Sequence, residues 1–129
     1  MRGLAAVLAL AACAPPSPDE AAAEAPFRPV YLGVETRLLE GDLVAFDVAM
    51  RGARDASDLA DYADCAAAQY ALIRGFGFAR HVRTNLSERA GVSRADAVYT
   101  VTPERPPGLR IIDAAARVDE CRARSIATV

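Results

Sequence analysis

Side chains able to carry out catalysis are few and scattered along this sequence. His81 is the only histidine, and a general base needs an oriented partner that no motif around it supplies. No serine lies in a nucleophile motif, and no glycine-rich phosphate loop occurs. One histidine and two distant cysteines, Cys65 and Cys121, do not form a recognisable metal-ligand set. We therefore expect no catalytic residues, no metal and no cofactor, and we expect His81 to lie on the surface.

Two carboxylates, Asp61 and Asp64, are close enough in sequence to suggest an acid–base pair or a cation site. Both lie off the apolar stripe of a predicted helix, beside Asp55 and Asp58. This placement favours a solvated acidic face near the start of that helix, where negative charge is stabilising.

Four arginines form a second candidate site. They flank a predicted loop, Asn85–Ser93, and they are Arg80, Arg83, Arg89 and Arg94. Guanidinium groups bind phosphate and carboxylate, so the cluster is a possible anion-binding site for lipopolysaccharide or a cell-wall polymer. The alternative is ordinary surface charge, because all 15 basic residues are arginine and no lysine is present.

The N-terminus has the anatomy of an export signal. Arg2 is followed by an apolar run, Leu4–Ala12, and then by Cys13. The run is too short to span a hydrocarbon core as a helix, which needs about 20 residues. The residues Leu10-Ala11-Ala12-Cys13 resemble the lipobox of bacterial lipoproteins. The resemblance implies a signal peptide over residues 1–12, cleavage before Cys13 and acylation of its thiol and new amine. A secretory signal cut near residues 21–23, or a buried N-terminal helix, stays an open alternative.

Lipidation at Cys13 implies a protein that is anchored in the cell envelope and faces the periplasm. Two or more acyl chains give stable anchoring. Ala14 stands where an aspartate, by the rule known for enteric lipoproteins, implies retention in the inner membrane; its absence favours the outer membrane. Residues 13–29 are predicted to be a lipidated cysteine and a Pro/Ala-rich tether, because prolines favour extended conformations.

If Cys13 carries lipid, two cysteines remain in an oxidising compartment. Such thiols tend to pair, so we expect a Cys65–Cys121 disulfide. Closing a loop of about 57 residues contributes roughly 4 kcal/mol in the chain-entropy model. The alternative is two separate thiols, with Cys65 a small core residue.

Alternating apolar residues predict a single globular domain over residues 30–129. Period-two patterns predict strands at residues 30–38, 43–50, 76–84, 95–101 and 109–118. A helix is predicted to end at Arg74, with Gly75 taking the left-handed conformation. Its start is marked by three possible caps: Asp55, Ser57 and Asp58. Asp119 is expected to cap a last helical turn that carries Cys121.

The predicted order is β-β-α-β-β-β, which favours an α+β fold. We expect a small, mainly antiparallel sheet of four or five strands with one helix packed on one face. The 129 residues suffice for one modest core. The net charge of −2 argues against a nucleic-acid partner, because phosphate contacts need a clearly basic protein.

Three short pairs in the folded region add a resemblance: Asp61-Tyr62, Cys65-Ala66 and Gly75-Phe76. They are similar to those of small uncharacterised alphaproteobacterial lipoproteins. That family implies an envelope location but no activity. We therefore expect a non-enzymatic structural or accessory lipoprotein that contacts an envelope protein through its sheet edges or the Asn85–Ser93 loop. The alternative is a module that binds an anionic envelope ligand through the four arginines.

Overall fold

The computed structural model describes residues 12–15 and 26–128. The elements follow one another as β1 (Val30–Leu38), β2 (Leu43–Arg51), α2 (Ala56–Ile73), β3 (Phe78–Arg89), β4 (Val92–Thr102), β5 (Ile111–Asp113) and α3 (Ala114–Ala123). The fold class is α+β, as the sequence predicts. Residues 1–11 and 16–25, which hold most of the predicted signal peptide and tether, lie outside the described residues.

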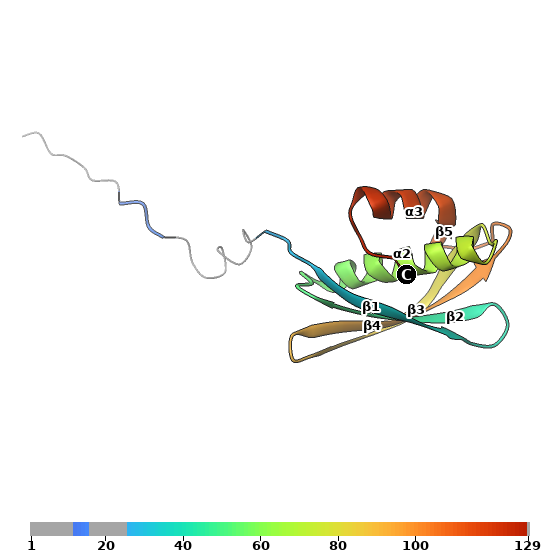
Figure 1. Ribbon diagram of the computed structural model, residues 1–129, viewed down its shortest axis with the longest axis horizontal. Coiled ribbons are helices and arrows are strands. Elements are labelled where there is room, and N and C mark those ends of the chain that lie inside the picture. Colours follow the sequence, from blue (N-terminus) through green and yellow to red (C-terminus); the bar gives the residue numbers. More distant parts are fainter. Residues whose placement is uncertain (1–11, 16–25, 129) are drawn as a thin grey trace, which may run out of the picture.

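The five strands form one sheet in the order β1-β2-β4-β3-β5, and every neighbouring pair is antiparallel. Both helices lie on the same side of this sheet (Figure 1). α2 packs directly on the sheet, and α3 lies on the far side of α2 (Figure 1). The other face of the sheet, called the open face below, carries no helix among residues 12–15 and 26–128. In the described part of the chain, neither helix is long and apolar enough to cross a membrane.

Small side chains allow α2 to approach the sheet closely. Ala66 and Ala67 of the helix and Ala95 and Ala97 of β4 are all fully buried. Larger buried side chains fill the remaining space, among them Phe46, Met50, Tyr62 and Tyr99. Asp55 caps the helix by accepting a 2.9 Å hydrogen bond from the Ser57 backbone N–H. The helix ends at Ile73, one residue before the predicted end, and Arg74 is its C-cap. Gly75 follows with a φ of 79°, as predicted.

The predicted Asn85–Ser93 loop is wrong. β3 continues to Arg89, β4 begins at Val92, and only Ala90 and Gly91 connect them. Both connecting residues have positive φ angles, 53° and 77°, which is the geometry of a tight two-residue hairpin turn. The polar composition of this segment therefore reflects two strands with exposed faces, not an irregular loop.

The predicted C-terminal strand and the single helix also need correction. β5 covers only Ile111–Asp113, and a second helix, α3, begins at Ala114. Asp113, not Asp119, is the N-cap, and its carboxylate accepts a 3.1 Å hydrogen bond from the Ala116 N–H. The structure thus ends in a strand and a full helix.

α3 is held to α2 by a disulfide. Cys65 of α2 and Cys121 of α3 are bonded, with 6.0 Å between their Cα atoms, and both side chains are buried. The predicted pairing is therefore present in the structure. Among the described residues, Cys13 is the one cysteine outside this bond, and it is exposed.

Candidate functional site

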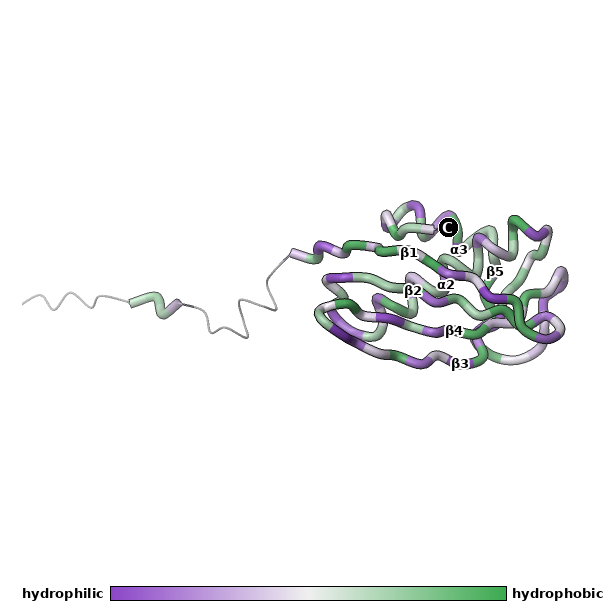
Figure 2. The backbone as a smooth tube through the Cα atoms, turned by 60° about the horizontal axis from the view of Figure 1, so that its bottom comes forward, coloured by the Kyte–Doolittle hydropathy of each residue, from purple (hydrophilic) through white to green (hydrophobic). Residues whose placement is uncertain are grey.

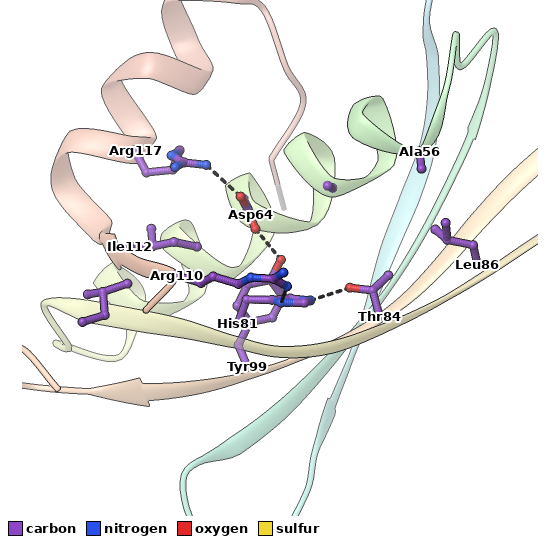
Figure 3. Close-up of a pocket in the computed structure, with 11 residues that line it drawn as sticks. Ala56, Asp64, His81, Thr84, Leu86, Tyr99, Arg110, Ile112 and Arg117 are labelled. Carbon is purple, nitrogen blue, oxygen red and sulfur yellow. Dashed lines mark hydrogen bonds and ion pairs between the residues drawn. The ribbon is translucent and has the colours of Figure 1, made fainter. Parts of the chain in front are cut away.

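A groove of about 460 Å³ opens between α2, the middle of β3 and the segment that leads into α3 (Figure 3). Its wall on α2 is formed by the small side chains of Ala56 and Ala60, which leave space beside the sheet. Asp64 of α2 also lines the groove. The other lining residues come from β3, β4, β5, α3 and the segment before β5: His81, Thr84, Leu86, Tyr99, Arg110, Ile111, Ile112 and Arg117.

The floor of the groove is a chain of polar contacts between buried Tyr99 and the partly buried Asp64 and Arg117. The Tyr99 hydroxyl donates to Asp64 at 2.5 Å, and Arg117 donates to the other oxygen of the same carboxylate at 2.8 Å. Burial raises the pKa of Tyr99, and the neighbouring Asp64 charge and hydrogen bond raise it further. Tyr99 therefore stays protonated and acts as a fixed donor. The chain joins β4, α2 and α3 across the floor.

The rim of the groove is formed by His81, Thr84 and Arg110. One His81 ring nitrogen, Nδ1, lies 3.2 Å from Nη1 of Arg110, and the other, Nε2, lies 2.6 Å from the Thr84 hydroxyl. A guanidinium only donates, so Nδ1 must be the acceptor and Nε2 carries the proton. The His81 ring also packs edge-on against Tyr99, with 5.3 Å between centroids. His81 is thus half-buried in this network and is not the surface residue expected.

A bulge in β3 explains why these side chains meet. The pairing of β3 with β4 shifts between His81 and Arg83, so one residue, Val82, has no partner. The shift keeps His81, Thr84 and Leu86 on the face that α2 covers, while Arg83 turns to the open face. Strict alternation along the sequence placed His81 and Arg83 together, and the bulge separates them.

The four predicted anion-binding arginines all lie on the open face of the sheet. Their partners in β4 or β3 are Thr100 for Arg80, Val98 for Arg83, Val92 for Arg89 and Ser87 for Arg94. None of the four forms an ion pair with a carboxylate within the described chain. They are spread along the hairpin: Arg89 lies nine positions after Arg80 on β3, a span of about 30 Å. The structure places them on one face without bringing them to one point.

The two helix carboxylates are not a solvated acidic face. Asp64 is bound by Tyr99 and Arg117, and Asp61 pairs with Arg124 of the C-terminal segment at 2.6 Å. Arg117 lies in α3, and Arg124 directly follows it. The sequence did not predict α3 as a helix. The described residues hold no group of three or more potential metal ligands.

Sequence reasoning missed the residues that form the groove. Arg110 and Arg117 are 29 and 36 residues from His81, and only the return of the chain along β5 brings them to it. Tyr99 lies within the predicted strand over residues 95–101, but its hydroxyl partner comes from α2, 35 residues away. The sequence carries one weak signal for the groove: small and polar residues stand side by side at the start of α2.

Comparison with known proteins identifies the folded part. Residues 31–125 match the YNQ4 C-terminal domain family, and the chain belongs to this family. The chain is also similar to an "uncharacterized 26.9 kDa protein in nqo8 5'region" of Paracoccus denitrificans, with 36% identity over 84 residues. The aligned part is 65% of this chain and 33% of that protein, so the chain spans about a third of its relative's length. No solved structure matches the chain. Kinship with an uncharacterised alphaproteobacterial protein is thereby confirmed.

Proposed function

We propose that this member of the YNQ4 C-terminal domain family is an envelope lipoprotein and a non-enzymatic accessory protein. In this proposal Cys13 is acylated and anchors the chain, with the outer membrane as the favoured site. Residues 13–29 act as a tether, and the globular domain faces the periplasm and binds another envelope protein.

The disulfide supports the location outside the cytoplasm. A buried Cys65–Cys121 bond between two helices is a structural feature, and structural disulfides persist in oxidising compartments such as the periplasm. Cys13 does not take part in it, which leaves its thiol available for acylation.

The free edge of β3 is the observation that carries the binding role. β5 pairs only with Phe78, Ala79 and Arg80, although β3 is 12 residues long. Residues 82–89 have no strand beside them on that side within the described chain. Figure 2 shows hydrophilic residues along much of β3, interrupted by single hydrophobic ones. Unpaired strand edges are ready templates for pairing with another chain.

Site-specific crosslinking in cells tests this role. A photoreactive amino acid is placed at Leu86, which is 52% exposed beside the free edge. The matched control places it at Glu35, an exposed residue on β1 at the opposite edge of the sheet. We expect one discrete adduct from position 86, identified by mass spectrometry and recovered in the reciprocal pull-down, and none from position 35. Equal, diffuse adducts from both positions would remove the edge as a contact surface.

Binding of an anionic envelope ligand is the second candidate function. It is favoured by the placement of Arg80, Arg83, Arg89 and Arg94 on one sheet face without carboxylate partners in the described chain. Replacing Arg83 and Arg89 by alanine should then abolish salt-sensitive binding to lipopolysaccharide or peptidoglycan. Unchanged binding, or no binding by the wild-type protein, would eliminate this candidate.

A further inference from the structure

We propose that the groove beside β3 captures the free C-terminus of a partner protein. The partner's last residues would add to β3 as an antiparallel strand, and their terminal carboxylate would bind Arg110. This inference rests on the proposed binding role of the β3 edge and specifies the kind of segment that the edge accepts.

The backbone of β3 offers hydrogen-bonding groups at the right positions. His81 directs its N–H away from β4 and donates to the Arg110 carbonyl at 3.3 Å. In an antiparallel strand, the backbone N–H and C=O groups of successive residues point to alternate sides. Those of Ala97 and Ala95 in β4 point to β2, so their β3 partners, Thr84 and Leu86, turn their own N–H and C=O groups to the free edge. An extended chain can therefore continue the pairing where β5 stops.

The position of Arg110 requires that such a chain end at this point. Because the Arg110 carbonyl already accepts from His81, an added strand running in line with β5 cannot pass it. A strand antiparallel to β3, as β5 is, arrives there with its C-terminus. A parallel strand would instead bring an N-terminal ammonium group to the Arg110 guanidinium, where like charges repel.

The charge at this end of the groove suits a carboxylate. The Arg110 side chain is exposed, and its one hydrogen bond among the described residues goes to His81. No carboxylate of the described chain lies within ion-pair distance of it. Of the charged groups that line the groove, Arg110 and Arg117 are positive and Asp64 is negative, which leaves one positive charge in excess. Guanidinium groups bind carboxylates through two parallel hydrogen bonds.

The shape of the groove favours an extended chain over a compact ligand. A second hollow of about 330 Å³ continues along β3 toward Glu88 and shares Ala56 and Leu86 with the first. Together the two hollows follow the free edge between β3 and the start of α2. Every second side chain of an added strand would point toward α2, against Ala60, Leu86 and Ile112. We therefore expect partner C-termini with apolar side chains at alternate positions.

Peptide binding tests the proposal. The protein is the proposed mature chain, residues 13–129, carrying Cys13→Ser so that no lipid is attached. A library of random octapeptides with free C-terminal carboxylates is selected on it. Selected peptides are then synthesised as free acids and as C-terminal amides, and their affinities are measured by fluorescence anisotropy. We expect the amide to bind about tenfold more weakly, because the charge-assisted pair with Arg110 is lost.

Two arginine variants separate recognition from general charge. Arg110→Gln should weaken the free acid by a similar factor and leave the amide unchanged. Arg83→Gln, on the open face of β3, should alter neither affinity. An intact disulfide and an unchanged melting temperature confirm that both variants are folded. Equal binding of acid and amide, or equal weakening of both by Arg110→Gln, would overturn the proposal.

A fatty acid, which also carries a free carboxylate, tests whether a simpler ligand than a peptide binds the groove. If dodecanoate binds in an Arg110-dependent manner and no peptide is selected, the groove takes a free amphipathic carboxylate and the added strand is wrong. The proposed function fails separately: it depends on the crosslink from position 86, which requires no free C-terminus in the partner.

Discussion

Asp64 is the residue on which the floor of the groove depends. It accepts from the buried Tyr99 hydroxyl and from Arg117, whose side chain is 29% exposed. Asp61, one helical turn earlier, pairs within the described part of the chain with Arg124 alone, whose side chain is 45% exposed. The two aspartates therefore provide a matched pair for measuring the contribution of this network.

Replacing Asp64 by alanine should lower the free energy of unfolding by about 2–3 kcal/mol. Truncation leaves a buried hydroxyl and a half-buried guanidinium without their acceptor. Asp61→Ala should cost less than about 1 kcal/mol, because water screens its pair with Arg124. Urea denaturation of both variants measures the difference, and equal losses would contradict the assigned role of Tyr99.

Asp58 should give stability that disappears in acid. Hydrogen bonds from the Arg54 side chain and backbone hold its pKa below the ordinary range, against the opposing effect of burial. The unfolded chain then binds a proton more readily than the folded one. This contribution is complete above the unfolded pKa of about 3.9 and is lost as the pH falls through the folded pKa.

Asp58→Asn removes the pH-dependent contribution. We expect it to lower the free energy of unfolding by about 1 kcal/mol at pH 7, a small effect because the Arg54 side chain is 57% exposed. The gap between wild type and variant should stay constant from pH 7 to about pH 5 and narrow below pH 4. Chemical denaturation at a series of pH values measures it, and a gap that widens in acid would refute the sign.

Residue types alone did not reveal the groove. The four arginines predicted to bind an anion lie on the sheet face opposite His81, which was expected to be a surface residue without a role. For Arg83 and Arg89 the physical cause is the bulge at Val82, which reverses the faces of the β3 residues after it and leaves no mark in the composition. Arg110 has a φ of 58°, a conformation that its residue type does not predict.

At the scale of elements, the β3–β4 turn contains a local strain that can be relieved. Ala90 has a φ of 53°, where a residue with a Cβ atom is disfavoured. Ala90→Asn creates an Asn-Gly pair, the preferred sequence for this turn. We expect an increase in the free energy of unfolding of about 0.5–1 kcal/mol, seen as a higher melting temperature. The same change at Ala115, exposed in α3, should lower the free energy of unfolding by about 0.5 kcal/mol. A loss of stability with Ala90→Asn would show that the turn is not of this type.

The disulfide should account for a large part of the attachment of α3. Its loop of about 57 residues predicts a loss of roughly 4 kcal/mol when Cys65 and Cys121 are both replaced by alanine. Reduced wild-type protein should unfold at the same urea concentration as the double variant. If oxidised wild type and the variant unfold together, the bond does not stabilise the fold and α3 is held by packing alone.

Elements with long, regular patterns were predictable from sequence. β1, β2 and α2 have the predicted character, because each repeats its period over nine or more residues. Residues 109–118 were predicted as a strand because Ala114, Ala116 and Val118 alternate. The spacing of Ala114, Val118 and Cys121 also fits a helix. The structure buries the second set, so helix packing against α2 decided the outcome.

At the scale of the molecule, the family match and the folded domain coincide. The match begins in β1 and ends just beyond α3, so the segment before residue 31 is not part of it. β1, where the domain begins, forms one edge of the sheet. The free part of β3 lies toward the opposite edge. A chain anchored before β1 therefore presents the β3 groove at the opposite side of the sheet from its attachment.

The anchor is the point on which the proposed function depends, and an intact mass of the protein extracted from its native membrane tests it. Thiols are alkylated with and without prior reduction. We predict a chain that begins at Cys13 with acyl chains attached, and two further thiols that alkylate only after reduction. An unlipidated chain, or Cys65 and Cys121 open to alkylation without reduction, would contradict the assignment to the envelope.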